Sequence, residues 1–313
     1  MTKNYTLSDT REHILTTLVY FDIFNYPLLV EEIHRFHVKP SSRSEIEEGL
    51  KLLVQENIIC YLDGFYSVKN DIALVAKRKR ANMLAKKQMI IARKAAWVLS
   101  RFPFVRGLAI SGSLSKNYGD EKADIDFFII TAPNKLWIAR TILHLFKKMT
   151  YLTGRQNRYC MNYFVDESVP LIEEKNIFTA MEIITLVPMY GKNTFDDFIN
   201  TNAWVSDYFP ICKANSNLAP EIQKGILSTM IERIFNTGFG NWLDNWLMSI
   251  TDRRWKKKVS SKRMNSKGNP MGMLVSRHCS KPNPKNFQDK VVSEFRIRIE
   301  NLLAPLKEMG RTG

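Results

Sequence analysis

Two apolar runs separated by a short polar segment constrain the fold more than any other feature of this sequence. Residues 105–110 and 125–131 are rich in β-branched, leucine and phenylalanine side chains, so each run predicts a buried strand. A Gly-Ser pair at 112–113 follows the first run, and the triplet Asp-Ile-Asp at 124–126 overlaps the start of the second. Polar and charged groups therefore stand at strand ends, where a sheet-based domain commonly binds its ligand.

The chemistry of these polar residues fits a metal ion bound together with phosphate. Asp124 and Asp126 lie two positions apart on a β-prone run, so their carboxylates share one face and repel unless a cation lies between them. Their hard oxygen ligands suit Mg²⁺ or Mn²⁺. Gly112 lets the backbone approach a ligand closely, and Ser113 is expected to begin a helix whose free N–H groups and positive dipole end favour phosphate. The residues predict a site for a metal ion and a nucleoside triphosphate.

This arrangement resembles the DNA polymerase beta-type nucleotidyltransferase superfamily, in which a hydrophobic strand, a Gly-Ser pair, about ten residues and an Asp-x-Asp triplet follow one another. The resemblance implies that Gly112 and Ser113 hold the β- and γ-phosphates of an NTP, while Asp124 and Asp126 coordinate two Mg²⁺ ions. An acceptor hydroxyl would attack the α-phosphate, and pyrophosphate would leave. Lys116, in the loop between the two motifs, is a further candidate for contact with phosphate or base. The implied activity is that of a nucleotidyltransferase.

The family normally carries a third carboxylate on a following strand, and three residues are candidates for that position. Asp166 supplies the charge but lies near the end of a predicted strand at 159–165. Asn162 lies mid-strand, where the acid is expected, but is neutral and a poorer metal ligand. Glu182, in a predicted helix, is the third option. We predict Asp166 as the third catalytic residue; if Asn162 holds the position instead, the site would bind nucleotide and turn over slowly.

The first part of the chain, residues 1–70, predicts a winged helix: three helices followed by a two-stranded hairpin. Asp63 and Gly64 separate two short β-prone runs, which is a strong hairpin signal. Residues 8–10 are expected to cap the first helix, and Ser44 the third. The expected helices cover residues 11–21, 29–36 and 44–56.

The third of these helices would be the one to read DNA, and its composition argues against that role. Its first turns contain Glu45, Glu47 and Glu48, whose carboxylates repel a phosphate backbone. We therefore favour a structural or protein-binding module. The alternative function for the whole chain is a winged-helix DNA-binding or scaffold protein whose degenerate transferase domain senses nucleotide.

The remaining pattern predicts an α+β chain, and the resemblance implies that a polymerase beta-like nucleotidyltransferase domain, a mixed sheet with flanking helices, occupies residues 71–190. Residues 191–313 are expected to form a helical C-terminal region with a basic segment. The layout, together with the runs at 162–164, 180–182 and 188–191, resembles bacterial proteins with a winged helix before a nucleotidyltransferase domain. Further helices are expected at 72–101, 135–152, 177–187, 222–250 and 291–303, while 251–290 is polar, basic and weakly patterned.

Charge is unevenly distributed along the chain, which has a net charge of +15. Residues 72–100 contain eight basic residues and no acid, and residues 252–290 contain twelve basic residues and two acids. This imbalance indicates a polyanionic partner, either nucleotide phosphates or a nucleic acid such as tRNA or another RNA; a protein acceptor is the alternative. No run approaches the roughly twenty apolar residues of a membrane span, so no membrane partner is expected. Four isolated cysteines without a CxxC pair favour a reducing cytoplasm.

Overall fold

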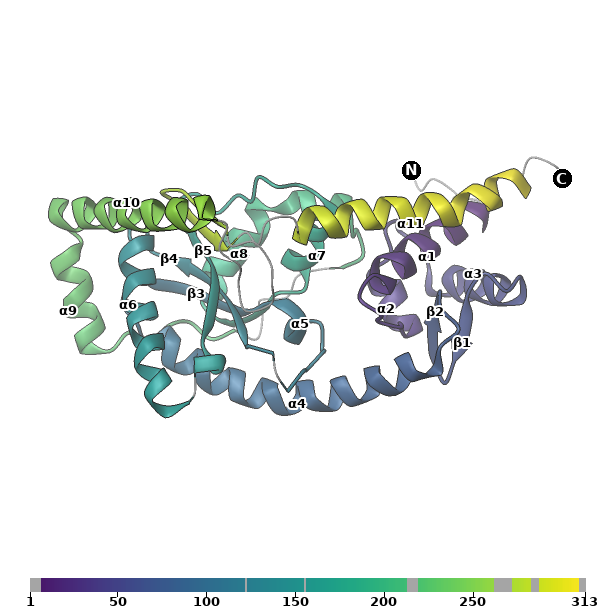
Figure 1. Ribbon diagram of the computed structural model, residues 1–313, viewed down its shortest axis with the longest axis horizontal. Coiled ribbons are helices and arrows are strands. Elements are labelled where there is room, and N and C mark those ends of the chain that lie inside the picture. The colour runs from purple at the N-terminus through teal and green to yellow at the C-terminus, as the bar shows by residue number, and fades with distance from the viewer. Residues whose placement is uncertain are drawn as a thin grey trace.

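The computed structural model of the chain describes residues 7–121, 123–154, 156–212, 219–261, 272–282 and 287–309. Three helices and a hairpin come first, a six-stranded sheet with helices on both faces follows, and long helices complete the C-terminal part (Figure 1). The fold is mixed α+β, as the sequence predicts.

The N-terminal module contains the three helices and the hairpin in the predicted order. Its turn has φ angles of 49° at Asp63 and 89° at Gly64, which is the geometry that favours this dipeptide in a two-residue hairpin loop. The hairpin prediction is therefore confirmed. The module comprises α1 (Leu7–Asp22), α2 (Val30–Arg35), α3 (Arg43–Gln55), β1 (Cys60–Leu62) and β2 (Phe65–Ser67).

Both predicted helix caps in this module are wrong. The first helix already begins at Leu7, so residues 8–10 lie inside it. The third helix is capped by Ser42, not Ser44: the Ser42 side chain accepts the Glu45 backbone N–H, and the Glu45 carboxylate accepts the Ser42 N–H. This reciprocal pair is a capping box, and it places the helix cap two residues earlier than the sequence suggests.

A single long helix, α4 (Ile72–Ser100), joins the N-terminal module to the sheet along the lower side of Figure 1. Arg78 anchors its first turns. The guanidinium is 1 % exposed, donates to the carbonyl of Pro27 and to Glu32 at 2.6 Å each, and lies 3.5 Å from the centre of the Tyr26 ring. Arg78 is thus a packing residue, whereas the other basic side chains of this helix face solvent.

The central sheet has the strand order β6-β3-β4-β5-β8-β7, and only β4 and β5 are parallel neighbours. Three of its strands are absent from the sequence-based prediction. Pro188 is expected to end a helix but lies in β6, an edge strand, where proline leaves no ladder hydrogen bond unmade. The strands are β3 (Val105–Ile110), β4 (Asp126–Thr131), β5 (Cys160–Asp166), β6 (Val187–Tyr190), β7 (Met273–Val275) and β8 (Cys279–Pro282).

Successive residues of β4 point to opposite faces of the sheet. Phe127 and Ile129 pack with α4 and α6, whereas Phe128 and Ile130 pack with α7, α8 and the core of the N-terminal module. Asp126 alternates with Phe127 and therefore belongs to the face on the side of the N-terminal module. The covering helices are α6 (Leu136–Thr150), α7 (Ile177–Ile184) and α8 (Lys192–Thr201).

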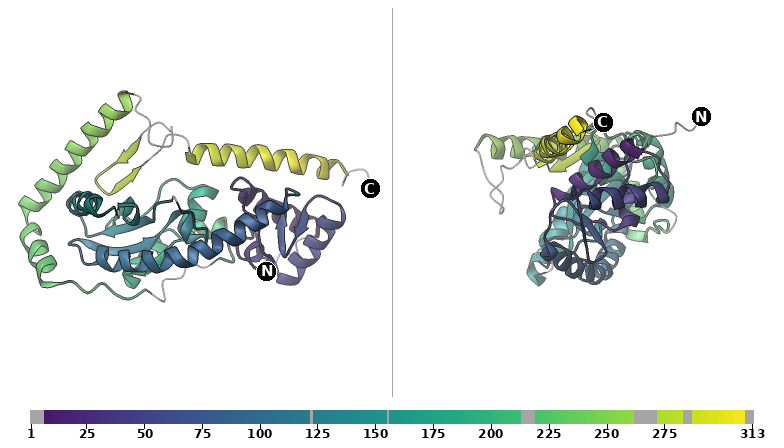
Figure 2. Two further views of the ribbon diagram at one scale, coloured as in Figure 1. Left: turned by 60° about the horizontal axis from the view of Figure 1, so that its bottom comes forward. Right: turned by 90° about the vertical axis from the view of Figure 1, so that its right-hand side faces the viewer.

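Within the described residues from 219 onward, three helices lie around the sheet and the N-terminal module. The single helix expected at 222–250 is two helices, because Thr237 caps a new one by accepting the backbone N–H of Gly240. Figure 2 shows α10 at the end of the molecule away from the N-terminal module, while α11 lies along that module. These elements are α9 (Ile226–Phe235), α10 (Gly238–Ser260) and α11 (Phe287–Met309), and short 3-10 turns cover Tyr151–Thr153, Gln156–Arg158 and Ala203–Asp207.

Candidate functional site

The strand register brings the Gly-Ser turn directly against the acid pair. Ile110 at the end of β3 lies opposite Phe127, and the Ser111 backbone N–H donates to the carbonyl of Asp126 at 3.0 Å. Gly112 has φ of +68°, and a Cβ at this position would lie 2.7 Å from Oδ2 of Asp126. Glycine fits here because any side chain would displace the carboxylate. The two halves of the motif are therefore packed together.

The helix expected after the turn forms, but it is only one turn long. It is α5 (Gly112–Ser115), and Lys116 ends it with its backbone N–H directed to the carbonyl of Ser113. One turn carries only a small part of the dipole of a longer helix. A phosphate contact at this place depends on the backbone N–H groups of the turn itself, and Ser113 is exposed there.

Asn162 is the residue of β5 that lies beside Asp126. The pairing of β4 with β5 skips Asn162, which makes it the extra residue of a bulge. Its Nδ2 donates to Oδ1 of Asp126 at 2.5 Å. Bulges often redirect a side chain in this way. An amide thus occupies the position at which the family resemblance implies a carboxylate.

Asp166 lies at the opposite end of the sheet from the acid pair. The register pairs Asp166 with Thr131, whereas Asp126 pairs with Cys160. The five residue steps of β4 from Asp126 to Thr131 span about 17 Å at 3.3 Å per residue. The prediction of Asp166 as a third catalytic residue is therefore wrong, because carboxylates this far apart cannot contact one metal ion.

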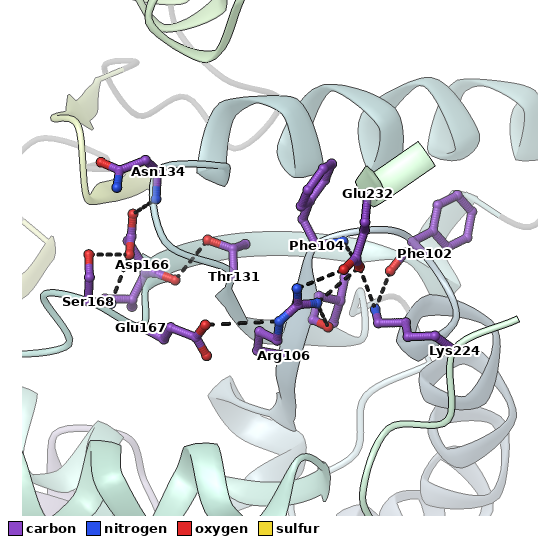
Figure 3. A network of polar contacts seen from close by, with 12 residues as sticks. Phe102, Phe104, Arg106, Thr131, Asn134, Asp166, Glu167, Ser168, Lys224 and Glu232 are labelled. Atoms are coloured by element: carbon purple, nitrogen blue, oxygen red, sulfur yellow. Dashed lines mark hydrogen bonds and ion pairs between the residues drawn. The ribbon is translucent and has the colours of Figure 1, made fainter. Parts of the chain in front are cut away.

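Hydrogen-bond donors from neighbouring loops and turns satisfy the carboxylate of Asp166 (Figure 3). The residue is fully buried, with 0 % exposure. Oδ2 accepts the backbone N–H of Asn134 at 2.6 Å, and Oδ1 accepts the N–H and hydroxyl of Ser168 at 2.8 and 2.6 Å. Nδ1 of His278 lies 3.2 Å from Oδ2. Asp166 holds together the loops at this end of the sheet.

A second network at the same end attaches α9 to the start of β3 (Figure 3). Two nitrogens of Arg106 donate to Glu232, at 2.7 and 3.0 Å, and the backbone N–H of Phe104 donates to the same carboxylate at 2.6 Å. Lys224 lies 3.6 Å from this carboxylate and donates to the carbonyl of Phe102. Burial lowers the pKa of Lys224 to about 8. Charged groups at this end therefore hold the fold together.

Cys160 lies beside the acid pair, a position that the sequence alone does not indicate. Burial, and then the charge of Asp126, raise the pKa of the thiol to about 12; Asp124 acts in the same direction. The thiol remains protonated near neutral pH and donates to Oδ1 of Asn162 at 3.1 Å. It orients the amide and does not supply a thiolate.

Lys116 and Glu182 form an ion pair next to the Gly-Ser turn. Nζ of Lys116 lies 2.8 Å from Oε1 of Glu182 and donates to the carbonyl of Gly112 at 3.1 Å. The hydroxyl of Tyr26 donates to the backbone carbonyl of Lys116 at 2.5 Å. Lys116 therefore lies beside the Gly-Ser turn, and Glu182 is paired with this lysine and not with the acid pair.

A cavity of about 380 Å³ reaches Gly112 and Ser113. Seven of its eleven lining residues are aromatic, and they come from the N-terminal module, the loop after α5, α7 and α11. The dense aromatic run at 20–26 was a signal for such a surface in the sequence. The lining consists of Tyr20, Phe21, Phe24, Tyr26, Gly112, Ser113, Lys116, Tyr118, Phe178, Glu182 and Phe287.

The carboxylates of Asp124 and Asp126 suit a cation that binds together with a phosphate-bearing ligand. Within the described ranges, no group of three or more His, Cys, Asp and Glu side chains is arranged to hold a metal ion. Mg²⁺ is commonly held by one or two carboxylates together with substrate phosphates and waters. The exposed Asp124 and the half-buried Asp126 fit that role.

Comparison of the chain with protein-family models, with curated proteins and with solved structures finds no match. Among the helices of the described residues, none combines the length and apolar character needed to cross a membrane. A function for this chain is therefore inferred from the geometry and chemistry of the site itself.

Proposed function

We propose that this chain is a metal-dependent nucleotidyltransferase of the polymerase beta type, with a polymerase beta-like sheet and an N-terminal winged helix. It would move a nucleoside monophosphate from an NTP to an acceptor hydroxyl. One observation carries the proposal: Gly112 and Asp126 are packed so closely that a Cβ would lie 2.7 Å from the carboxylate. The backbone of the turn is thereby held against the carboxylate of Asp126, and Nζ of Lys116 lies beside the turn, 3.1 Å from the carbonyl oxygen of Gly112.

Each residue of the site has a role in this reaction. Asp124 and Asp126 would hold Mg²⁺, and the turn at Gly112 and Ser113, with Lys116, would hold the phosphates. Bound Mg²⁺ supplies charge neutralisation on the phosphate oxygens and a lower pKa for the acceptor hydroxyl. The acceptor oxygen forms a bond to the α-phosphorus, the bond from that phosphorus to the bridging oxygen breaks, and pyrophosphate leaves.

The second candidate is a nucleotide-binding protein without appreciable turnover, which could act as a sensor or scaffold. Its specific support is Asn162, which donates to Asp126 and cannot accept a proton as a carboxylate can. The two candidates share a ligand and differ in the release of pyrophosphate.

A nucleic acid, such as tRNA or another RNA, is the favoured acceptor, with a protein hydroxyl as the alternative. Exposed lysine and arginine side chains along α4 supply positive charge for a phosphate backbone. DNA reading by α3 is disfavoured because Arg43, at its start, is paired with Glu31 and Glu47 at 2.9 and 2.8 Å. A cytoplasmic location is part of the proposal, since Cys60, Cys160, Cys212 and Cys279 are all free thiols.

The experiment that tests the function is labelling of cell fractions. The full chain is incubated with Mg²⁺ or Mn²⁺, each α-³²P-labelled NTP, and separated RNA, protein and metabolite fractions. Label in one fraction, lost in the Asp124→Asn and Asp126→Asn variants, supports transfer and names the acceptor class. NTP binding that needs the two aspartates, without label in any fraction, supports the sensor. NTP affinity unaffected by Mg²⁺ and by both substitutions rejects the metal–nucleotide site.

A further inference from the structure

Parts of the chain that are far apart in the sequence build one lined cavity next to the Gly-Ser turn. Its volume of about 380 Å³ lies within the range of small-molecule sites. Tyr20 and Tyr26 of the N-terminal module, Phe178 of α7 and Phe287 of α11 contribute aromatic walls. The N-terminal module is therefore part of a ligand-sized site that reaches the proposed phosphate contact.

Two of the aromatic walls remain open to solvent. Phe24 is 39 % exposed and Phe287 is 51 % exposed, whereas Tyr20 is only 2 % exposed. Burying such rings against a planar group removes apolar surface from water and adds the attraction of stacked rings. The cavity favours a flat, unsaturated ligand over a bulky aliphatic one.

The charged groups among the lining residues of the cavity are the ion pair of Lys116 and Glu182, at 2.8 Å. Lys116 has only donors and Glu182 has only acceptors, so the pair presents one of each to the edge of a ligand. Burial, and then the charge of Glu182, raise the pKa of Tyr20 well above its ordinary value, so its hydroxyl stays protonated. A hydrocarbon ring would leave these polar groups without new partners, whereas a heterocycle with ring nitrogens, carbonyls or amino groups can bond to them.

We propose that this cavity binds a nucleobase, with the ring between the aromatic walls and its polar edge on Lys116 and Glu182. The placement of the attached phosphates toward Gly112 rests on the proposed function. The base belongs either to the incoming NTP or to the end of a nucleic-acid acceptor. The N-terminal module thereby acts in ligand recognition and not in DNA reading.

The test compares ligands that differ only in the base. Isothermal titration of the full chain with Mg²⁺ uses the common NTPs, tripolyphosphate (which lacks a base), free nucleosides and a short oligoribonucleotide. The variants are Phe24→Ala and Phe287→Ala, with Phe239→Ala as the control, because Phe239 is a 58 % exposed phenylalanine of α10 outside the cavity. Loss of one base–aromatic stack is expected to weaken binding by about 5-fold or more. Glu182→Gln, which keeps the size of the side chain, serves as a second test if a truncated variant does not fold.

Each result assigns the base or overturns the proposal. Weaker NTP binding with unchanged tripolyphosphate binding places the base of the NTP in the cavity. Weaker oligoribonucleotide binding with unchanged NTP binding places the acceptor base there. The proposal is overturned if folded Phe24→Ala, Phe287→Ala and Glu182→Gln chains bind NTPs, nucleosides and oligoribonucleotide as tightly as the Phe239→Ala control.

Failure of the proposed function gives a different pattern. If no fraction is labelled and Asp124→Asn and Asp126→Asn leave NTP binding unchanged, the transferase proposal fails. If a nucleoside still binds to the wild-type chain and binds more weakly to Phe24→Ala, the cavity is a nucleobase site without transfer chemistry.

Discussion

Asp126 and Asp166 lie on neighbouring parallel strands, at opposite ends of one sheet. Asp166 is fully buried, and the backbone of Asn134 and both donors of Ser168 satisfy its carboxylate. Asp126 is partly exposed and lies against a glycine whose Cβ it would exclude. A fully buried carboxylate surrounded by donors stabilises the fold, whereas Asp126, which accepts a hydrogen bond from Asn162, keeps part of its surface exposed beside the turn.

The acid-pair end contains Gly112, Asp124 and Asp126, and the anchored end contains Arg106, Asp166 and Glu232. If the comparison holds, substitutions at the acid-pair end change activity more than stability, and substitutions at the anchored end do the reverse.

Asp126→Asn is expected to have the largest effect on activity. Loss of a carboxylate from the metal site should reduce labelling by about 1000-fold, the equivalent of roughly 4 kcal/mol in the barrier. The melting temperature should change little, because the amide keeps the size of the side chain. Quantitative labelling and thermal unfolding of the same preparation check both statements; a large loss of stability with activity retained in the folded fraction would contradict them.

Asp166→Ala is the corresponding test of the anchored end. It leaves the N–H groups of Asn134 and Ser168 without their acceptor, which should cost at least about 3 kcal/mol in the free energy of unfolding. Labelling per folded molecule should stay within about twofold. Urea unfolding measures the first effect, and Asp166→Asn, which keeps one acceptor oxygen, should cost less. Loss of activity in a stable variant would move Asp166 back to the functional site.

Gly112→Ala separates backbone strain from displacement of the acid. Gly154 has nearly the same φ, +66° against +68°, but nothing lies within 4 Å of its Cβ position. Both substitutions should cost about 1 kcal/mol of stability through backbone strain. Only Gly112→Ala pushes on Asp126, and we expect it to lower labelling by about 100-fold. Equal activity of the two variants would show that the close contact has no functional role.

The pH dependence of stability tests a further buried acid, Asp244 of α10, which accepts the backbone N–H of Ile138 at 2.8 Å. Burial raises its pKa from 3.8 to about 6. The folded state therefore binds the proton more tightly, and this contribution is complete below pH 3.8 and is lost as pH rises through about 6. The unfolding free energy of wild type relative to Asp244→Asn should fall by about 2 kcal/mol between pH 4 and pH 7. A pH-independent difference in urea unfolding would reject the raised pKa.

Asn162→Asp has the smallest expected effect and tests the bulge. The new carboxylate would face Asp126, so the half-saturating Mg²⁺ concentration for labelling should fall by about 10-fold. Repulsion should lower the melting temperature in the absence of Mg²⁺. The control is Asn245→Asp, which adds the same charge at an exposed position of α10. Identical Mg²⁺ titrations of the two variants would mean that Asn162 does not face the metal position.

Features set by residues close together in the chain were predictable. The hairpin at Asp63 and Gly64 follows from local turn geometry, and α4 follows from a long run of helix-forming residues between clear end signals. The acid pair could also be found from its spacing, but β4 begins at Asp126, so Asp124 lies in the loop before the strand and not on it. The structure adds the contact of Gly112 with Asp126 to this prediction, because the antiparallel register of β3 and β4 places the two residues together.

The tertiary structure decided what depends on distant residues. Strands β6, β7 and β8 are short and carry weak patterns, so only their partners in the sheet make them strands. The position of Asn162 beside Asp126 depends on a bulge and on the register of β4 with β5, and neither can be read from the residues of one strand alone. The aromatic cavity likewise exists only where α1, α7 and α11 meet. The sequence by itself determined the chemical groups of the acid-pair end, and the non-local packing determined which of them face one another, because strand partners are fixed by burial and not by neighbours in the chain.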